Sequence, residues 1–309
     1  MIEIVAPGLF TTVQDLGRYG YGALGVSPSG AADPVSLRIG NLLIGNPEWA
    51  PALEITLLGG KFLFREGALI ALTGSDFGAT IGSRPIENWA ATVVAPGERL
   101  DLGPTRSGAR CYLCVHGGIA VKPLLGSAST HILTGLGGFE GRPLKKGDVL
   151  PIGPAHEATP LAINAEVLER LKPRKILRAT VAPQTRWFSS KSIDLFYGSV
   201  YRVTEESNRM GLRLEGPALE TPQSGHMTSE GVSLGTIQVP AGGQPIILFV
   251  EQQTTGGYPK IANIISADLA SVGQLRPRDD VRFDFVTPEA ARALIREKEE
   301  ILRSGALFR

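Results

Sequence analysis

The stretch from Lys61 to Leu72, KFLFREGALIAL, contains the pattern that decides the fold class. Two short apolar runs, Lys61–Phe64 and Leu69–Leu72, are interrupted by a turn-forming Arg-Glu-Gly sequence. The same pattern recurs along the chain, in which 38 glycines and 22 prolines separate short segments rich in β-branched residues. This spacing favours sandwiches or barrels, and we expect further strands at Ala91–Val94, Ala109–Val115, Ser199–Thr204, Thr236–Val239, Ile246–Val250 and Val281–Phe285.

Helices are expected at only a few places. Asp33 can cap a helix that has Pro34 at its first position and ends at Gly45. The apolar spacing of residues 287–304 predicts an amphipathic C-terminal helix. A third helix is expected to begin near Tyr258-Pro259-Lys260 and to run through Ile265.

The 309 residues divide into two halves in this interpretation. The segment 153–175 is rich in Pro and Ala and contains a charged, helix-like piece, Ala165–Leu171. It predicts a connection between a first half, about 1–155, and a second half, about 175–290.

Composition excludes several classes of function. The formal net charge is +1, with 31 basic and 30 acidic residues, and the chain contains no Lys/Arg run of the kind that binds nucleic acid. No apolar run approaches the length of a membrane span, so no membrane partner is expected. The N-terminus lacks the features of a signal peptide, and two cysteines are few for a secreted protein, which predicts a cytoplasmic location.

Cys111 and Cys114 form a CxxC within a predicted buried strand that continues to His116. Residues three apart on a strand point to opposite faces, so one metal ion or one disulfide is not expected to use both. We therefore predict no metal site here and interpret both cysteines as apolar core residues.

The first of four segments dense in polar residues and glycine runs from Thr12 to Asp33 and contains Asp15 and Arg18. Its glycines can let the backbone approach a ligand, and Arg18 can clamp a carboxylate or phosphate with two hydrogen bonds. The alternative is a pair of β-turns tied by an Arg–Asp salt bridge.

The second segment carries the hydroxyls of Ser127, Ser129 and Thr130, followed by His131 and a glycine-rich loop at 135–141. Such a loop can hold a phosphate or a carboxyl group, although neither a P-loop nor a dinucleotide-binding motif fits. His131 is the most plausible histidine for proton transfer, and a solvated loop histidine is the alternative.

The third segment places Arg209 and Arg213 four residues apart, where both can bind one anion or pair with neighbouring glutamates. The fourth is the densest, with Glu230, Gln238 and the run Gln253-Thr254-Thr255-Gly-Gly-Tyr258-Pro-Lys260. Its neutral hydrogen-bonding groups suit an amide or a lactam, and Lys260 can neutralise an anion. No familiar nucleophile motif occurs, which leaves a β-rich protein with a polar, glycine-lined site.

Six of these stretches together resemble the biotin-dependent carboxyltransferase-like family, which includes the C component of 5-oxoprolinase, KipA, the second component of allophanate hydrolase and part of urea carboxylase. They are TVQDLGR (12–18), GVSPSGAAD (25–33), PALEIT (51–56), GSAST (126–130), SNRMGLRL (207–214) and QTTGGYP (253–259). The resemblance extends from about Ile4 to about Phe285, with the motifs in family order.

This resemblance implies two cyclophilin-like β-barrel halves with a few short helices. It also implies one subunit of an ATP-dependent 5-oxoprolinase, which converts 5-oxoproline to L-glutamate together with a KipI-like partner and a LamB-like partner. ATP with Mg²⁺ is expected to be shared with a partner subunit. The chain lacks a Met-Lys-Met biotinylation sequence, so it is not expected to carry biotin itself.

Within this interpretation, the residues expected to act fall into three groups. Arg18, Arg209 and Arg213 clamp anions, and Lys260 neutralises charge. Asp15, Glu54 or Glu230 orient these groups or transfer protons. The residues expected to contact substrate are Ser127, Ser129, Gln253, Thr254, Thr255 and Tyr258.

Two departures from the family pattern leave alternatives open. His131 stands where many relatives have Asp, and Glu251-Gln252 where many have Asp-Arg, so the substrate can differ from 5-oxoproline. One alternative is a carboxyltransferase component acting on urea or a related amide. The other is a KipA-like regulatory protein that binds a KipI-like kinase inhibitor.

Overall fold

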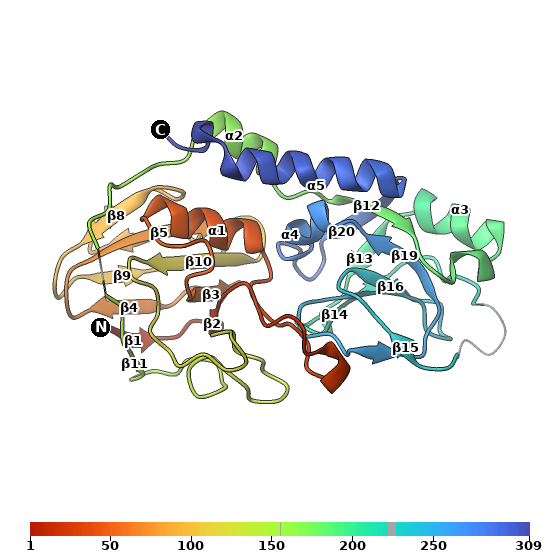
Figure 1. Ribbon diagram of the computed structural model, residues 1–309, viewed down its shortest axis with the longest axis horizontal. Helices are drawn as coiled ribbons and strands as arrows, with labels where there is room; N and C mark the ends of the chain where they lie inside the picture. Colours follow the sequence, from red (N-terminus) through yellow and green to blue (C-terminus); the bar gives the residue numbers. More distant parts are fainter. Residues whose placement is uncertain (155, 222–226) are drawn as a thin grey trace. The chain divides into compact units, whose positions relative to one another are not determined.

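The structure is a computed structural model that describes residues 1–154, 156–221 and 227–309 (Figure 1). The chain forms two compact units, and each is described by itself. The first comprises Met1–Arg18, Ser29–Leu171 and Ile301–Arg309, and the second comprises Tyr19–Pro28 and Lys172–Glu300. Among the described residues, no helix combines the length and apolar character needed to cross a membrane.

Two antiparallel sheets form the first unit. One has the strand order β11-β1-β4-β9-β6-β7 and the other β2-β3-β10-β5-β8. The strands are β1 (Ile2–Ala6), β2 (Phe10–Gln14), β3 (Ala52–Thr56), β4 (Lys61–Phe64), β5 (Ala68–Gly74), β6 (Thr80–Ile81), β7 (Arg84–Pro85), β8 (Ala91–Val94), β9 (Arg99–Asp101), β10 (Arg110–Val115) and β11 (Val149–Leu150).

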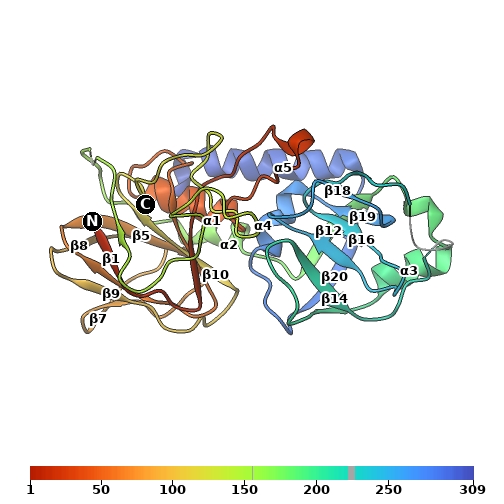
Figure 2. The same ribbon diagram turned by 90° about the horizontal axis from the view of Figure 1, so that it is seen from below.

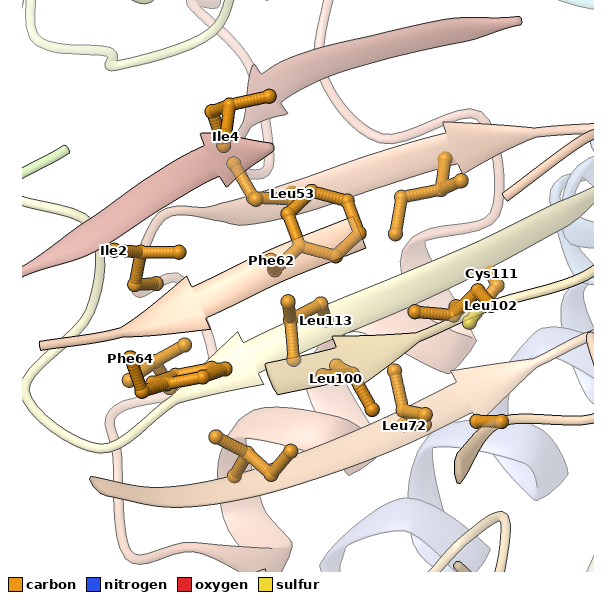
Figure 3. Close-up of a cluster of buried hydrophobic side chains, with 14 of the residues drawn as sticks. Ile2, Ile4, Leu53, Phe62, Phe64, Leu72, Leu100, Leu102, Cys111 and Leu113 are labelled. Carbon is orange, nitrogen blue, oxygen red and sulfur yellow. The ribbon is translucent and has the colours of Figure 1, made fainter. Parts of the chain in front are cut away.

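The core of the first unit lies between the two sheets. Figure 3 shows Ile4 and Phe62 of one sheet close to Leu53 and Leu113 of the other. Cys111 also faces this core, whereas Cys114 lies on the opposite face of β10, where its Sγ is 3.8 Å from the carbonyl oxygen of Leu37. Both thiols are free, and burial raises the pKa of each, as expected for apolar core residues.

Helix α1 (Pro34–Leu43) packs on β5 and β10 of the first unit (Figure 1). It begins as predicted, because the Asp33 side chain accepts a hydrogen bond from the backbone N–H of Ser36 at 3.0 Å and Pro34 occupies the first turn. The helix-like piece at 165–171 is α2 (Ala165–Leu171).

The second unit contains a closed barrel with the strand order β12-β19-β16-β17-β14-β13-β20. Figure 2 shows β12, β19 and β16 side by side in it. A separate two-stranded ribbon, β15–β18, accompanies the barrel. The strands are β12 (Ile176–Val181), β13 (Tyr201–Val203), β14 (Gly211–Glu215), β15 (Glu230–Gly231), β16 (Thr236–Gln238), β17 (Ile246–Leu248), β18 (Thr255–Gly256), β19 (Lys260–Ile264) and β20 (Asp280–Phe285).

Short helices complete the chain. The α-helices outside the first sheets are α3 (Ser190–Gly198), α4 (Leu269–Val272) and the C-terminal α5 (Pro288–Arg303), and the single 3₁₀ turns are η1 (Gly22–Leu24), η2 (Thr185–Trp187), η3 (Ser266–Asp268) and η4 (Gly305–Leu307). The prediction of a mainly β protein with few helices is therefore confirmed. The second unit has the expected closed barrel, while the strands of the first unit form two sheets.

The predicted third helix is wrong, because Lys260–Ile264 forms strand β19. This strand pairs with both β12 and β16, and Ile261, Ala262 and Ile264 are buried. A strand buried on both faces gives a continuous apolar run, which periodicity alone does not distinguish from a buried helix.

Candidate functional site

In the first unit, the side chains of Asp15, Ser127 and Ser129 bind one another. The Asp15 carboxylate accepts hydrogen bonds from Ser127 Oγ at 2.6 Å, Ser129 Oγ at 2.5 Å and the backbone N–H groups of Ala128 and Gly17 at 2.6 and 2.7 Å. Four donors occupy the four lone-pair sites of a carboxylate. The predicted proton-transfer and substrate-binding groups therefore hold the 127–129 loop against the end of β2.

Arg18 lies inside the first unit with 1% of its surface exposed. Its guanidinium donates a hydrogen bond to the carbonyl oxygen of Ser129. A Cβ atom at Gly137 would lie 2.5 Å from Arg18 Nη2, so the glycine-rich loop encloses the guanidinium. Arg18 thus supports the loop, and the structure does not display it as a clamp on an open surface.

The glycine-rich loop after Thr130 is shaped by close packing within the protein. Gly137 has φ +64°, and a Cβ atom there would overlap the carbonyl oxygen of Ser129. At Gly138, a Cβ atom would overlap the Thr130 hydroxyl. His131 is 5% exposed, and its Nδ1 lies 2.6 Å from Thr134 Oγ1. These contacts stabilise the loop fold and leave no phosphate cradle in it.

Glu54 is a buried anchor in the first unit. Its carboxylate accepts hydrogen bonds from Tyr112 Oη at 2.7 Å and from the backbone N–H of Ala32 at 2.8 Å, and Arg110 Nε lies 3.5 Å away. Burial, and next the Glu54 charge, raise the pKa of Tyr112 well above its ordinary value. Glu54 therefore fixes the segment that leads into α1.

In the second unit, Arg209 and Arg213 lie in different surroundings. Arg209 is buried, and its Nε is 2.5 Å from Glu251 Oε1 in an ion pair whose side chains are 7% and 2% exposed. Arg213 is 55% exposed and lies 3.8 Å from Glu206. It lines an open groove of about 710 Å³ that also contains Arg202 and Arg278. The two arginines therefore do not form a common anion clamp, and Glu251 keeps a carboxylate at the first of the two departing positions.

The fourth segment forms the densest polar arrangement of the second unit. We call it the Lys260 cluster, and it consists of Gln184, Glu230, Gln238, Gln253 and Lys260. Lys260 Nζ donates to Glu230 Oε1, and Gln184 Nε2 donates to the same oxygen at 2.8 Å. These hydrogen bonds, first from Lys260 and then from Gln184, lower the pKa of Glu230. The cluster therefore contains a buried cation held by an ionised carboxylate.

The barrel positions the cluster on its outer face. Ile237 of β16 is fully buried, so Thr236 and Gln238 point to the opposite face of the strand. The ladder between β16 and β19 pairs Gln238 with Lys260 across a bulge. Gln184 comes from the residue that precedes η2. Residues distant in sequence thus converge beside the β15–β18 ribbon.

Gly256 brings the ribbon close to the glutamines. In β18, Gly256 pairs with Glu230 of β15. A Cβ atom at Gly256 would lie 2.5 Å from Gln238 Nε2 and 3.1 Å from Gln253 Nε2. Gln253 Nε2 in turn lies 3.4 Å from Gln238 Oε1. A side chain at position 256 would therefore displace the amide of Gln238.

The other predicted contact residues lie at the edge of this cluster. Gln253 and Thr255 are exposed, whereas Thr254 and Tyr258 are half-buried. The carbonyl oxygen of Thr254 accepts a hydrogen bond from Val232 N at 3.1 Å. The structure brings Gln253, Glu230 and Lys260 together as the sequence predicted.

Sequence reasoning did not select Gln184, and it quoted Gln238 without giving it a role. Both are buried, with 5% and 1% of their surface exposed. Among the described residues, Gln184 Oε1 and Gln238 Nε2 have no hydrogen-bond partner. Each such buried atom costs about 1–3 kcal/mol. The available signal was a glutamine alternating with apolar residues in a predicted buried strand, at Thr236-Ile237-Gln238.

The donors of this chain do not fit a nucleotide–metal site. In the described ranges, no three His, Cys, Asp or Glu side chains gather as metal ligands. Ser127 and Ser129 donate to Asp15, and Arg209 is paired with Glu251. We therefore assign none of these residues to ATP or Mg²⁺.

Known proteins resemble this chain along nearly its whole length. The family described as "Carboxyltransferase domain, subdomain A and B" matches residues 24–285. The C component of 5-oxoprolinase from Escherichia coli (strain K12) is 41% identical over 283 residues, which cover 92% of this chain and 90% of that protein. The Haemophilus influenzae protein of the same name is 36% identical over 302 residues, covering 97% and 96%.

A solved structure shares the fold. The crystal structure of the K. lactis urea amidolyase superposes with a TM-score of 0.93 at 34% identity. The match covers 100% of this chain and 20% of that one, so this chain spans about a fifth of the urea amidolyase.

Proposed function

The chain belongs to the carboxyltransferase family of subdomains A and B, and from this membership we propose that it is the C component of an ATP-dependent 5-oxoprolinase. The observation that carries the proposal is similarity to two proteins of that name over 90% and 96% of their lengths. The reaction is 5-oxoproline + ATP + water to L-glutamate + ADP + phosphate.

A lactam carbonyl is a poor electrophile, so opening the ring requires stabilisation of the negative charge that develops on its oxygen. The Lys260 ammonium is a buried cation fixed by Glu230, and a cation already in place loses little free energy to reorganisation. We assign the lactam oxygen to Lys260 and the holding of Lys260 to Glu230. Gln253, Thr254 and Tyr258 border the bound ring.

Partner subunits complete the enzyme in this proposal. The KipI-like partner contributes the nucleotide site, for which this chain lacks the donors, and the LamB-like partner takes part in ring opening. When bound, ATP supplies the phosphoryl group that activates the amide. We place the assembly in the cytoplasm, where free thiols such as Cys111 and Cys114 are usual.

The experiment is glutamate release from 5-oxoproline by the three purified subunits, with and without ATP, leaving out each one in turn. The proposal expects ATP-dependent glutamate only when this chain is present with both partners. Activity that persists without this chain, or its absence from the complete assembly, contradicts the proposal.

A second candidate is favoured by the structural match to the urea amidolyase. In this alternative the chain takes part in carboxyl transfer to urea or a related amide, with biotin carried by another protein. The same assembly assayed with urea, a biotinylated carrier and bicarbonate distinguishes the two, since only this alternative consumes ATP in a urea-dependent and carrier-dependent way.

A further inference from the structure

Gln184 presents a hydrogen-bond acceptor whose identity is fixed by its neighbour. Its amide lies 2.8 Å from Glu230 Oε1. An ionised carboxylate only accepts hydrogen bonds, so the atom facing it must be Nε2 and the other must be the carbonyl oxygen, Oε1. That oxygen is buried, and no partner for it occurs among the described residues. Gln184 thus offers one unused acceptor beside the ion pair.

Lys260 presents unused donors at the same place. Its ammonium donates to Glu230 Oε1, the oxygen that Gln184 also binds. An ammonium has three N–H donors, and Glu230 is the one partner of Lys260 in the described part of the chain. One carboxylate oxygen therefore holds a donor and an acceptor side by side, both turned away from bulk water.

This inference rests on the proposed function and specifies what the site recognises. We infer that Gln184 and Lys260 together bind a cis-amide, with the substrate N–H donating to Gln184 Oε1 and its C=O accepting from Lys260 Nζ. A lactam ring holds N–H and C=O on the same side of the amide, whereas an open-chain secondary amide is trans and directs them to opposite sides. Gln184 is then a specificity-determining residue for lactams and urea-like amides.

The pairing predicts which analogues the site rejects. A lactone of the same size has the C=O but an ether-type oxygen in place of the N–H. Binding it would leave Gln184 Oε1 buried without a donor and would place two acceptors together. Sites that hydrogen-bond a substrate N–H discriminate strongly against analogues that lack it, because their own buried groups lose partners.

The test measures the affinity of the assembled complex without ATP, by calorimetry, for 5-oxoproline and for its lactone analogue, 5-oxotetrahydrofuran-2-carboxylate. We expect wild type to bind the lactam at least about tenfold more tightly. Gln184→Met should reduce the ratio of the two affinities to about one, because the acceptor is gone. The matched control Gln244→Met removes a glutamine that binds Gly216 elsewhere in the second unit and should leave the ratio unchanged.

Equal binding of lactam and lactone by wild type, no binding of either, or a Gln184→Met ratio equal to that of wild type overturns the inference. If Gln184→Met does not fold, Gln184→Asn, which keeps the amide and shortens its reach, should show the same loss of discrimination. A complex that releases no glutamate but retains the Gln184-dependent ratio refutes the proposed function alone. Glutamate release with an unchanged ratio refutes this inference alone.

Discussion

Lys260 and Glu230 form an ion pair whose two members differ in exposure. The side chain of Lys260 is 4% exposed, while that of Glu230 is 41% exposed. Removing the carboxylate leaves a buried ammonium without its counter-ion, which is costly, although solvent near Glu230 reduces the loss. We expect Glu230→Gln to lower the free energy of unfolding by about 2 kcal/mol, measured by urea denaturation at neutral pH. A change below about 0.5 kcal/mol would contradict this pairing.

The same pair makes a prediction about pH. Hydrogen bonds from Lys260 and Gln184 hold the pKa of Glu230 below its ordinary value of 4.5. A carboxylate with a lowered pKa contributes stability that is fully present above its ordinary pKa and is lost as the pH falls through the folded-state value. The stability difference between wild type and Glu230→Gln should therefore be constant between about pH 6 and 8 and should shrink below about pH 4. Urea denaturation across this range measures it, and a difference that grows in acid contradicts the assignment.

Gly256 permits the close approach of the ribbon to the glutamines. In Gly256→Ala, the new methyl group would displace the end of the Gln238 side chain, a group that can move at modest cost. We expect affinity for 5-oxoproline to fall at least about tenfold while stability changes by about 1 kcal/mol or less. Gly231→Ala, on the neighbouring strand, is the control, because a Cβ atom there meets nothing within 4 Å. Equal affinities of the two variants would show that the packing at Gly256 does not shape the site.

Gly137 and Gly135 form a matched pair in the first unit, because both have φ +64°. A side chain at either position is strained by the left-handed conformation, which costs about 1–2 kcal/mol. At Gly137 it would also overlap the Ser129 carbonyl oxygen, whereas at Gly135 the nearest atom is 3.9 Å away. We expect Gly137→Ala to lose about 3 kcal/mol or more, and Gly135→Ala only the conformational part. Thermal denaturation measures both, and similar losses would refute the packing of Gly137 on Ser129.

Asp15 is expected to stabilise the fold, although the sequence favoured a catalytic role. Asp15→Asn replaces one acceptor oxygen by a donor and disrupts the bonds to Ser127, Ser129 and Ala128. We expect a loss of about 3 kcal/mol. Asp76→Asn is the control, since Asp76 also accepts from a backbone N–H two residues ahead, at 2.7 Å, but is 45% exposed. Unchanged stability in Asp15→Asn together with lost activity would restore the catalytic interpretation.

Local signals gave correct predictions from the sequence. Helix α1 was predicted because its cap, Asp33, and its first residue, Pro34, act on neighbouring backbone. The strands were predicted because glycine and proline mark their ends. Strand β19 was mistaken for a helix because its burial comes from β12 and β16, which are far away in the chain.

The candidate site was predictable only in part, for the same physical reason. Gln253, Glu230 and Lys260 were selected from one dense segment of the second half. Gln184 lies 46 residues from Glu230, and only the barrel brings the two together. Arg209 was expected to bind an anion, but its partner is Glu251, 42 residues away. Sequence shows which side chains can carry charge, and the fold decides which of them neutralise one another.

The most direct test of the central claim is glutamate release by the complete complex containing Lys260→Met, compared with wild type and with a Lys191→Met control, in which an 82% exposed lysine is replaced. If Lys260 stabilises the developing charge on the lactam oxygen, ATP-dependent glutamate release should fall at least about a hundredfold. The subunits should still co-purify, and the control should retain wild-type activity. Wild-type rates in a complex that contains Lys260→Met would contradict the claim that the Lys260 cluster is the active site of a 5-oxoprolinase.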